Sequence, residues 1–343
     1  MLISDKLRTI GIVRETKEVT IVCPTAVAAY SGAEVQCLEL VRLVRKLGPD
    51  VKLICLSKKC AARYHSGTTA VKLLMLLLLI PSILRAWKTP TLILWGLPAM
   101  MIGLPLTRLL RQNGRILCTE RQWSNASKSR SWIYKLYKRH EWFFNSSHVL
   151  NGFVGEGIVV PEKARIFLNI KNREIQYARR SYTNWGCAET QRSFGSLEHI
   201  WVGRINRAKN LEDAILHCAG NSVTSLTIFG RNEDPQYLFE LREKAKMCGV
   251  KLNYAGHMPR SRIFSSTRLL VHTSRAEGMP NSVLDAIIFG TPVVSVPCDF
   301  LRDLEFPRAW QLNGTYTGEA NLTGFSSYRD KVCAALYVEA LDL

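Results

Sequence analysis

The sequence predicts an α/β protein with two domains, each built on a parallel β-sheet. Its 343 residues fit two units at ~150 residues per domain. Short β-branched runs alternate with helix-length segments in two successive series, which is typical of βαβ units with parallel strands. A polar stretch at 172–196 separates the two series and is the expected linker. With 47% hydrophobic and 22% charged residues, the composition excludes disordered, collagen-like and coiled-coil chains.

The first series begins with a β-branched run that ends in a loop. The loop Ser31-Gly32-Ala33-Glu34 then opens a helix that reaches Leu47. Polar or glycine-containing segments separate the further runs. The strands expected in this series lie at 19–24, 51–56, 91–95, 115–119, 148–151 and 165–168.

The second series has the same pattern over residues 199–296. Its expected helices lie near 211–219, 236–247 and 281–289, and its expected strands at 199–203, 225–229, 251–254, 269–273 and 292–296. In open parallel sheets, ligands bind at the carboxyl ends of the strands. We therefore expect the chemistry in the loops that follow these strands.

The positive charge of the chain lies in its first half. The net charge is +18; residues 1–195 hold 30 basic and 12 acidic residues (30 − 12 = +18), and residues 196–343 hold 16 of each (16 − 16 = 0). An anionic partner of the first domain, either a membrane surface or a nucleic acid, is expected.

Two apolar stretches are too short or too broken to predict a membrane span. The run 73–84 has 12 residues, whereas a spanning helix needs ~20. It is either a core helix or a helix lying in a bilayer surface, with Lys and Arg residues around it. Prolines and glycines divide the uncharged stretch 89–107 into a short strand, a loop and a helix.

The ten cysteines are scattered, without a Cys-x-x-Cys pair or a zinc-site spacing. We therefore expect reduced thiols, no metal site and a cytoplasmic protein. The charged segment 1–10 does not resemble a signal peptide.

Two loops of the second series offer groups that suit a phosphorylated ligand. The strand end Val202-Gly203 is followed by Arg204 and Lys209, which supply a guanidinium, an ammonium and backbone amides to one anion. The alternative is a solvated basic loop. The next strand ends at Gly230 and Arg231, where a glycine permits close approach of a ligand, although a simple turn requires glycine equally.

The segment 272–286 combines an anion site with two carboxylates. Pro280 fits the first turn of a helix, so the amides of Gly278, Met279 and Asn281 point outward. Glu277 lies at the start of this helix, and Asp285 lies eight residues further, about 12 Å along the axis. The alternative is an acidic first turn that complements the helix dipole.

Together these segments resemble the nucleotide-sugar-binding domain of retaining glycosyltransferases of family 4, or glycosyl transferases group 1. The matching parts occur in the family's order over about 95 residues: Val202-Gly203-Arg204 with Lys209-Asn210, Ile228-Phe229-Gly230, Tyr254-Ala255-Gly256, Ser274 to Asp285, and Phe289 to Val294. In the first half, Ser31-Gly32-Ala33-Glu34 resembles the family's glycine loop, and Thr119-Glu120-Arg121 resembles its acceptor-side segment.

The resemblance implies the GT-B fold, with two Rossmann-like parallel-sheet domains that face each other across a cleft. Residues 1–180 are expected to form a basic, acceptor-binding and membrane-associating domain, and residues 196–325 a nucleotide-sugar-binding domain. Residues 326–343 are expected to form a terminal helix that packs on the first domain. The implied enzyme is a metal-independent retaining hexosyltransferase without a cofactor, peripheral on the cytoplasmic face of the inner membrane, in cell-surface polysaccharide or glycolipid biosynthesis. Its implied donor is a nucleotide-diphosphate sugar, with a UDP-sugar as the prior, and its acceptor is lipid-linked or a glycan.

The resemblance also implies roles for individual residues. Arg204 and Lys209 would hold the donor diphosphate, and Glu277 would position the sugar by its hydroxyls. The other donor-side candidates are Gly32, Gly203, Gly230, Arg231, Gly256, His257, Gly278, Met279, Asn281 and Asp285. Asp285 stands where the family has a ribose-binding Glu and is one methylene shorter, and Ser31 replaces a glycine. Glu120 and Arg121 are the acceptor-side candidates.

Two other functions remain compatible with parts of the sequence. Basic and aromatic residues interleave over 121–143, which is also the pattern of single-stranded nucleic-acid binding. No nucleic-acid motif accompanies this region, and that function leaves the donor-site segments unexplained. A GT-B nucleotide-sugar epimerase would use a similar donor site but would not need a basic first domain.

Overall fold

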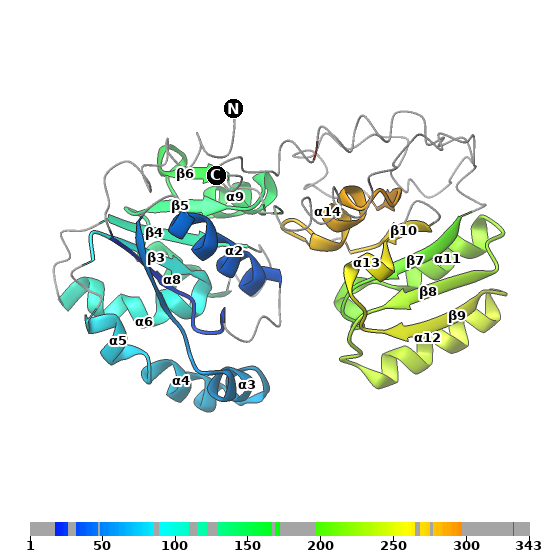
Figure 1. Ribbon diagram of the computed structural model, residues 1–343, viewed down its shortest axis with the longest axis horizontal. Coiled ribbons are helices and arrows are strands. Elements are labelled where there is room, and N and C mark those ends of the chain that lie inside the picture. Colours follow the sequence, from blue (N-terminus) through cyan, green and yellow to red (C-terminus); the bar gives the residue numbers. More distant parts are fainter. Residues whose placement is uncertain are drawn as a thin grey trace. The chain divides into compact units, whose positions relative to one another are not determined.

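A computed structural model of the chain shows two parallel-sheet α/β units, which confirms the predicted fold class (Figure 1). The boundary between the units falls between Asn169 and Lys171. The structure describes residues 18–26, 32–46, 49–85, 89–109, 115–121, 129–166, 169, 171, 197–264, 268–274, 277–296 and 332. The expected linker and nearly all of the expected terminal helix lie outside these residues.

The first unit contains a six-stranded parallel sheet with the order β2-β1-β3-β4-β5-β6. Its strands are β1 (Glu18–Val22), β2 (Asp50–Ile54), β3 (Thr91–Trp95), β4 (Arg115–Glu120), β5 (Glu141–Phe144) and β6 (Ala164–Ile166). Its helices are α2 (Gly32–Lys46), α3 (Lys58–Ser66), α4 (Thr69–Leu77), α5 (Ile80–Arg85), α6 (Gly96–Leu109), α8 (Ser131–Lys135) and α9 (Ser147–Gly155), with a 3-10 turn η3 at Pro161–Lys163.

Apolar side chains cover both faces of this sheet. All five residues of β3 are buried, as expected for a strand with helices on each side. One core packs the inner side chains of α2, such as Leu43 and Val44, against Ile21 and Ile93. The other core contains residues of α4, α5, α6, α8 and α9.

One strand prediction in the first unit is wrong. Residues 148–151 lie in α9, and the strand of this region is β5, Glu141–Phe144. The hydroxyl of Ser146 accepts a hydrogen bond from the backbone N–H of Val149 and so caps the start of α9. Val149 and Phe153 are both buried while Asn151 between them is exposed, which fits a helix and not a strand, whose alternation would bury all three on one face.

The second unit contains a five-stranded parallel sheet with the order β11-β10-β7-β8-β9. Its strands are β7 (Glu198–Val202), β8 (Ser225–Phe229), β9 (Lys251–Gly256), β10 (Arg268–His272) and β11 (Val293–Ser295). Its helices are α11 (Glu212–Gly220), α12 (Pro235–Met247), α13 (Arg260–Ile263) and α14 (Asn281–Ile288), with a 3-10 turn η5 at Arg207–Lys209. The chain runs from β7 toward β8 and β9 on one side, and it places β10 and β11 on the other. The direction of strand order therefore changes between β7 and β10, and the loops after these two strands lie side by side.

No helix among the described residues is both long enough and apolar enough to cross a membrane.

Candidate functional site

The strongest candidate site lies at the change of strand order in the second unit. The loop after β7 carries Lys209, and the loop after β10 carries Glu277. These two residues are 68 positions apart, and their side chains form an ion pair. Each side chain is about one-fifth exposed, 20% for Lys209 and 19% for Glu277. The structure thus brings together two residues that the sequence assigned to the same site from separate loops.

Hydrogen bonds around Thr273 fix the backbone of Lys209. The indole Nε1 of Trp201 donates to Thr273 Oγ1 at 3.1 Å, and this hydroxyl donates to the carbonyl oxygen of Lys209, also at 3.1 Å. Asn210 follows with a left-handed φ of 50°, which ends η5. The position of Lys209 therefore depends on both β7 and β10.

The environment keeps Glu277 ionised. Burial alone would raise the pKa of this carboxyl, but the charge of Lys209, the neighbouring His272 and hydrogen bonds from Lys209 and Ser274 together outweigh burial and hold the pKa below the ordinary value. Next to the pair, burial lowers the pKa of His272 to about 4, against a partial opposing effect of Glu277. His272 is therefore neutral at pH 7.

We expect the second unit to lose stability in mild acid because of His272. Its pKa falls from an ordinary 6.5 in the unfolded chain to about 4 in the folded one, so the unfolded chain binds a proton first as the pH drops. Neutral His272 therefore contributes fully to the free energy of unfolding above about pH 6.5, and this contribution is lost progressively as the pH falls toward 4. Between pH 7 and pH 5 the free energy of unfolding should fall by roughly 1 to 2 kcal/mol from this residue. Urea unfolding of the wild type and of His272→Gln over this range measures it.

The variant should show a shallower loss of stability with falling pH. Burial also lowers the pKa of His217 to about 4, so part of the slope should remain. An identical slope in both proteins would contradict the assignment.

Arg204 has a different partner from Lys209. Its guanidinium contacts Glu233 at 3.3 Å, and this carboxylate also binds Arg231 at 2.5 Å and accepts a hydrogen bond from Asn206 at 2.9 Å. Burial would raise the pKa of Glu233, but these partners lower it below its usual range. The sequence predicted that Arg204 and Lys209 serve one anion; here each is bonded to its own carboxylate. Glu233 was not foreseen, because an acidic residue in a loop carries no distinctive motif.

Three of the predicted glycines meet at the carboxyl edge of the sheet. Gly203 donates its N–H to the carbonyl oxygen of Phe229 at 3.0 Å, and Gly230 donates to that of Gly256 at 2.8 Å. A Cβ on Gly230 would lie 1.7 Å from the carbonyl oxygen of Gly203. Gly230 and Gly256 both have positive φ values, 143° and 72°. This edge therefore requires glycine at 230 for packing, independently of any ligand.

The segment after β10 leads into α14 as predicted. Pro280 is the N-cap of this helix, Gly278 and Met279 are buried, and Asn281 is half-buried at the first helical position. The N-terminus of α14 thus follows directly from Glu277, and its first amides are of the kind that bind phosphate. That they contact a donor stays a prediction.

Asp285 is surrounded by cations. Its Oδ1 accepts a bond from Nζ of Lys171 at 2.7 Å, and its Oδ2 pairs with Nε of Arg260 at 2.6 Å. The Lys171 side chain is 0% exposed and that of Asp285 is 4% exposed. Whether Asp285 also contacts a ribose stays a prediction, but both of its oxygens are already bonded. Lys171 was missed because it lies 114 residues away, at the edge of the expected linker.

The remaining donor-side candidates lie at different places. His257 is exposed directly after Gly256, and Gly32 is the first residue of α2 in the first unit. Their roles stay predictions. Among the described residues, no group of three or more His, Cys, Asp or Glu could hold a metal ion.

The acceptor-side candidates form a cluster in the first unit. Glu120 ends β4 and accepts hydrogen bonds from the hydroxyl of Tyr134 at 3.0 Å and the N–H of Leu97 at 3.3 Å. Burial raises its pKa above the usual value despite these bonds. Arg121 stacks over the ring of Trp95 at 4.6 Å, and burial lowers its pKa to about 10. Both residues are thus held at the carboxyl ends of β3 and β4.

In the interleaved basic and aromatic region, most of the aromatic side chains that the structure describes are buried. Tyr134, Tyr137 and Trp142 are buried, and they pack in the same core as Phe144 and Phe153. Trp132 is exposed. Base stacking requires accessible rings, so the burial of these three side chains argues against single-stranded nucleic-acid binding here.

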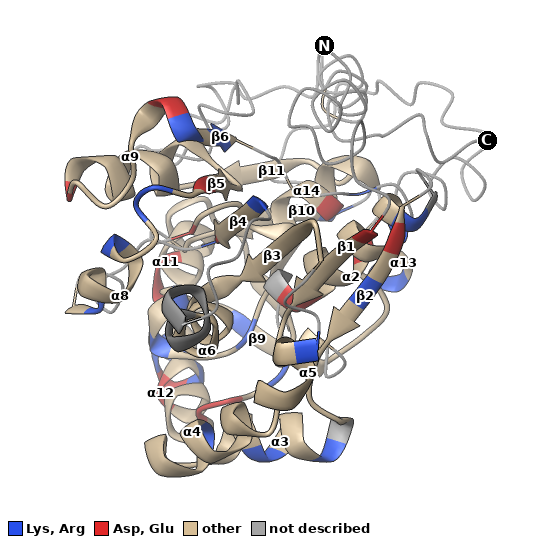
Figure 2. Ribbon diagram, turned by 90° about the vertical axis from the view of Figure 1, so that its left-hand side faces the viewer, with Lys and Arg blue, Asp and Glu red and all other residues tan. Residues whose placement is uncertain are grey.

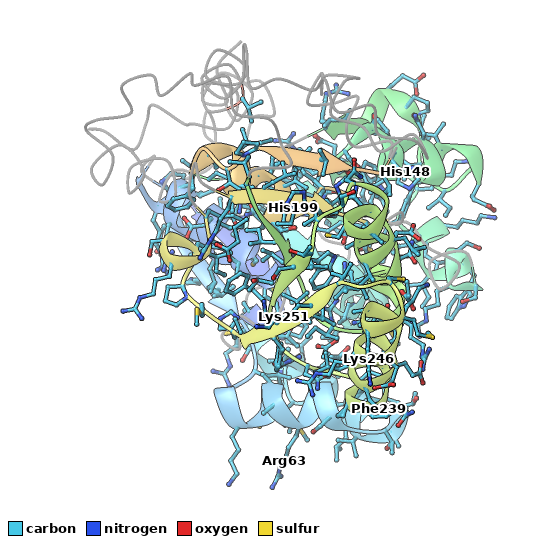
Figure 3. All side chains as sticks on the ribbon, turned by 90° about the vertical axis from the view of Figure 1, so that its right-hand side faces the viewer. Arg63, His148, His199, Phe239, Lys246 and Lys251 are labelled. Carbon is cyan, nitrogen blue, oxygen red and sulfur yellow. The ribbon has the colours of Figure 1, made fainter. Side chains whose placement is uncertain are left out.

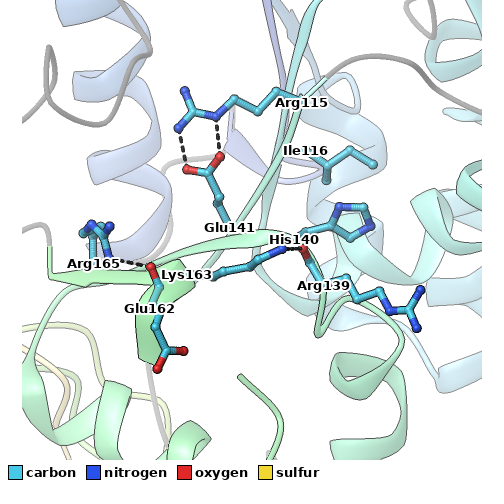
Figure 4. A pocket seen from close by; sticks show the side chains of 8 residues that line it. All are labelled: Arg115, Ile116, Arg139, His140, Glu141, Glu162, Lys163 and Arg165. Carbon is cyan, nitrogen blue, oxygen red and sulfur yellow. Dashed lines mark hydrogen bonds and ion pairs between the residues drawn. The ribbon is translucent and has the colours of Figure 1, made fainter. Parts of the chain in front are cut away.

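A polar pocket of about 370 Å³ lies in the first unit at the amino ends of β4 and β5, the ends away from Glu120 and Arg121 (Figure 4). Arg115 and Glu141 begin β4 and β5 and form a two-pronged ion pair across it. Lys163 donates to the carbonyl oxygen of Arg139 at 2.7 Å, and Arg165 donates to that of Glu162 at 2.9 Å. The pocket lies at the amino ends of the strands, whereas open α/β sheets bind ligands at the carboxyl ends, so we do not assign the donor site to it.

The paired residues Lys209 and Glu277 lie in the part of the chain that a known family matches. Residues 195–310 match glycosyl transferases group 1. This range includes all the donor-side candidates of the second unit. No curated protein matches the chain at a significant level.

Solved structures share the architecture of both units. A sucrose-phosphate synthase from Thermosynechococcus elongatus has a TM-score of 0.69 at 13% identity, covering 95% of this chain and 97% of its own. A glycosyltransferase from Rickettsia africae has a TM-score of 0.66 at 12% identity, covering 95% and 96%. HepE from Anabaena in complex with UDP-glucose has a TM-score of 0.61 at 14% identity, covering 95% and 93%. At these identities the likeness shows the fold, which is GT-B. The group 1 match and the GT-B fold together support a glycosyltransferase.

Proposed function

We propose that this protein transfers a hexose-type sugar from a nucleotide-diphosphate sugar to a lipid-linked or polysaccharide acceptor, with retention of configuration. The observation that carries the proposal is the Lys209–Glu277 ion pair at the change of strand order, where open α/β sheets bind ligands. In the proposed mechanism Lys209 binds the diphosphate, and Glu277 accepts hydrogen bonds from sugar hydroxyls. HepE, which shares the fold, was solved in complex with UDP-glucose, so a UDP-sugar is the first donor to test.

The chemistry follows from where negative charge develops. As the bond between the anomeric carbon of the sugar and the diphosphate oxygen breaks, negative charge accumulates on the departing diphosphate. A fixed cation close to this charge lowers the barrier. Lys209 suits this role because four-fifths of its side chain is withdrawn from water and its backbone is held by Thr273. Arg204 is more exposed and would reach the same phosphate only by leaving Glu233. We propose that these cations neutralise the leaving group without a metal ion.

The acceptor would bind at Glu120 and Arg121 in the first unit. In the proposal the enzyme is peripheral on the cytoplasmic face of the inner membrane, where it acts in cell-surface polysaccharide or glycolipid biosynthesis. The +18 charge supports an anionic surface as partner, because all of the excess lies in residues 1–195.

A titration of the purified protein with UDP, GDP, ADP and CMP tests the donor site. A ligand that binds only the native state raises the unfolding midpoint with concentration, so one diphosphate should produce a saturable shift. Lys209→Ala should weaken this binding by roughly 10- to 100-fold, which is the loss of one charge-assisted hydrogen bond. The shift that the ligand induces in each protein is compared between variant and wild type. The midpoints themselves are not compared, because Lys209→Ala also removes the partner of Glu277 and can change the stability without ligand.

Lys246→Ala is the matched control, since Lys246 is an exposed lysine on α12. It should bind the nucleotide as the wild type does. If Lys209→Ala retains full affinity, the donor site lies elsewhere. Retention is tested separately, from the anomeric configuration of the product by NMR spectroscopy.

A further inference from the structure

We propose that the outer faces of α4 and α5 insert into an anionic lipid bilayer. The proposal deepens the proposed function by naming the surface that meets the membrane, and it rests on that function only for the identity of the acceptor. Two observations carry it: a row of exposed leucines, and a long segment with positive charge alone.

The leucines lie on the side of α4 that faces away from the core. Leu73, Leu74, Leu77 and Leu78 are 52%, 56%, 48% and 54% exposed, and Leu84 of α5 is 43% exposed. Their spacing of i, i+1, i+4 and i+5 places the first four on one face of a helix. Met75, Leu76, Leu79 and Ile83 are buried and pack in the core of the first unit. The segment formed by α4 and α5 is thus apolar on two sides, but among the described residues only the inner side packs against other parts of the protein.

Such a surface is unusual in a protein that meets only water. Single exposed apolar residues are common, whereas a contiguous group marks a binding surface. The run is too short to span a bilayer, so its leucines would lie in the interface between headgroups and acyl chains.

The surrounding charge selects an anionic partner. Residues 51–119 contain ten Lys and Arg residues and no Asp or Glu. Lys59 and Arg63 on α3 and Arg85 at the end of α5 are exposed, and Lys72 of α4 lies 6.0 Å from the centre of the Tyr64 ring. Figure 2 shows α3 and α4 together at one end of the first unit, and Figure 3 shows the Arg63 side chain extending away from the ribbon. Exposed leucines beside basic side chains match a membrane surface that is apolar within and negative at its headgroups.

Sedimentation with lipid vesicles tests the proposal. The full-length protein is mixed with vesicles of phosphatidylcholine alone, or of phosphatidylcholine and phosphatidylglycerol at about three to one. We expect binding to the anionic vesicles that weakens with salt, and little binding to the neutral ones. Leu74→Gln/Leu77→Gln should reduce the partition coefficient at least ~10-fold, because two apolar side chains no longer insert.

Matched variants separate the contributions. Leu216→Gln/Phe239→Gln replaces two exposed apolar residues of the second unit, 48% and 58% exposed, and should bind vesicles as the wild type does. Lys59→Gln/Arg63→Gln should weaken binding to anionic vesicles only. Unchanged vesicle binding by the leucine variant would overturn the proposal.

Two further measurements distinguish membrane insertion from self-association and from misfolding. Size-exclusion chromatography detects a dimer of this chain; a wild-type dimer that the leucine variant dissociates would overturn the proposal in favour of self-association. The leucine variant should keep the nucleotide-induced midpoint shift, which shows that it is folded. Vesicle binding without any nucleotide response would leave the membrane surface standing and refute the proposed function.

Discussion

Replacing Lys171 with Met should destabilise the second unit by about 3 kcal/mol. The Lys171 side chain is fully buried, and its ammonium is 2.7 Å from Oδ1 of Asp285, which is also buried. Removal of one member of a buried ion pair leaves the other charge poorly compensated, and such losses are typically about 3 to 5 kcal/mol. We expect the lower end because Arg260 still contacts the second oxygen of Asp285. Urea unfolding at pH 7 measures the change.

Two related variants make this expectation specific. Arg260→Met removes a bond to the same carboxylate, but the Arg260 side chain is 40% exposed, so its loss should cost about 1 kcal/mol or less. Lys171→Met/Asp285→Asn removes both charges and should recover part of the stability, since no unpaired carboxylate remains. If Lys171→Met is as stable as the wild type, the ion pair does not hold this part of the unit together.

Gly230→Ala should be about as damaging, for a steric reason. The new Cβ would lie 1.7 Å from the carbonyl oxygen of Gly203, far inside contact distance, and the φ of 143° is strained for any residue with a side chain. The position of a Cβ is set by its own backbone, and the hydrogen bonds of Gly203 to Phe229 and of Gly230 to Gly256 hold both backbones in place, so a rotamer change cannot relieve the clash. We expect a loss of roughly 3 kcal/mol or more.

The same substitution should also weaken nucleotide binding. Moving Gly203 displaces the loop that carries Arg204 and Lys209. Gly220→Ala is the control, because no atom lies within 4 Å of its Cβ position and Gly220 ends α11. This control should be neutral, or more stable by up to ~1 kcal/mol. Equal stability of both variants would mean that β7 and β8 end further apart in solution.

The sequence predicted most of the fold because its strands and helices have strong local patterns. Ten of the eleven described strands were expected within a few residues of where they lie, since each is a short apolar run bounded by turn residues. The exception, β5, consists of Glu-Trp-Phe-Phe inside a region rich in basic and aromatic residues. There the aromatic side chains indicated a surface, whereas they form a core.

The sequence located the loops that carry the donor-side candidates but not the partners of their charged residues, and donor binding itself stays a prediction. Glycine and proline positions identified the loops after β7, β8, β9 and β10, and these loops do follow the carboxyl ends of their strands. The partners of Arg204 and Asp285 were not predicted. Glu233 and Lys171 are ordinary charged residues whose importance depends on what folding brings beside them.

The sequence by itself determined the two α/β units, the order of the loops that bear the donor-side candidates, and the basic character of the first half. These properties depend on neighbouring residues, through hydrophobic period, turn chemistry and charge. Only the tertiary structure decided that Lys209 pairs with Glu277 across 68 residues and Lys171 with Asp285 across 114. It also decided that Tyr134 and Trp142 are buried while the outer leucines of α4 are exposed. Strand order and the packing of each helix set these contacts, because they determine which distant side chains share an edge and which apolar face finds a partner.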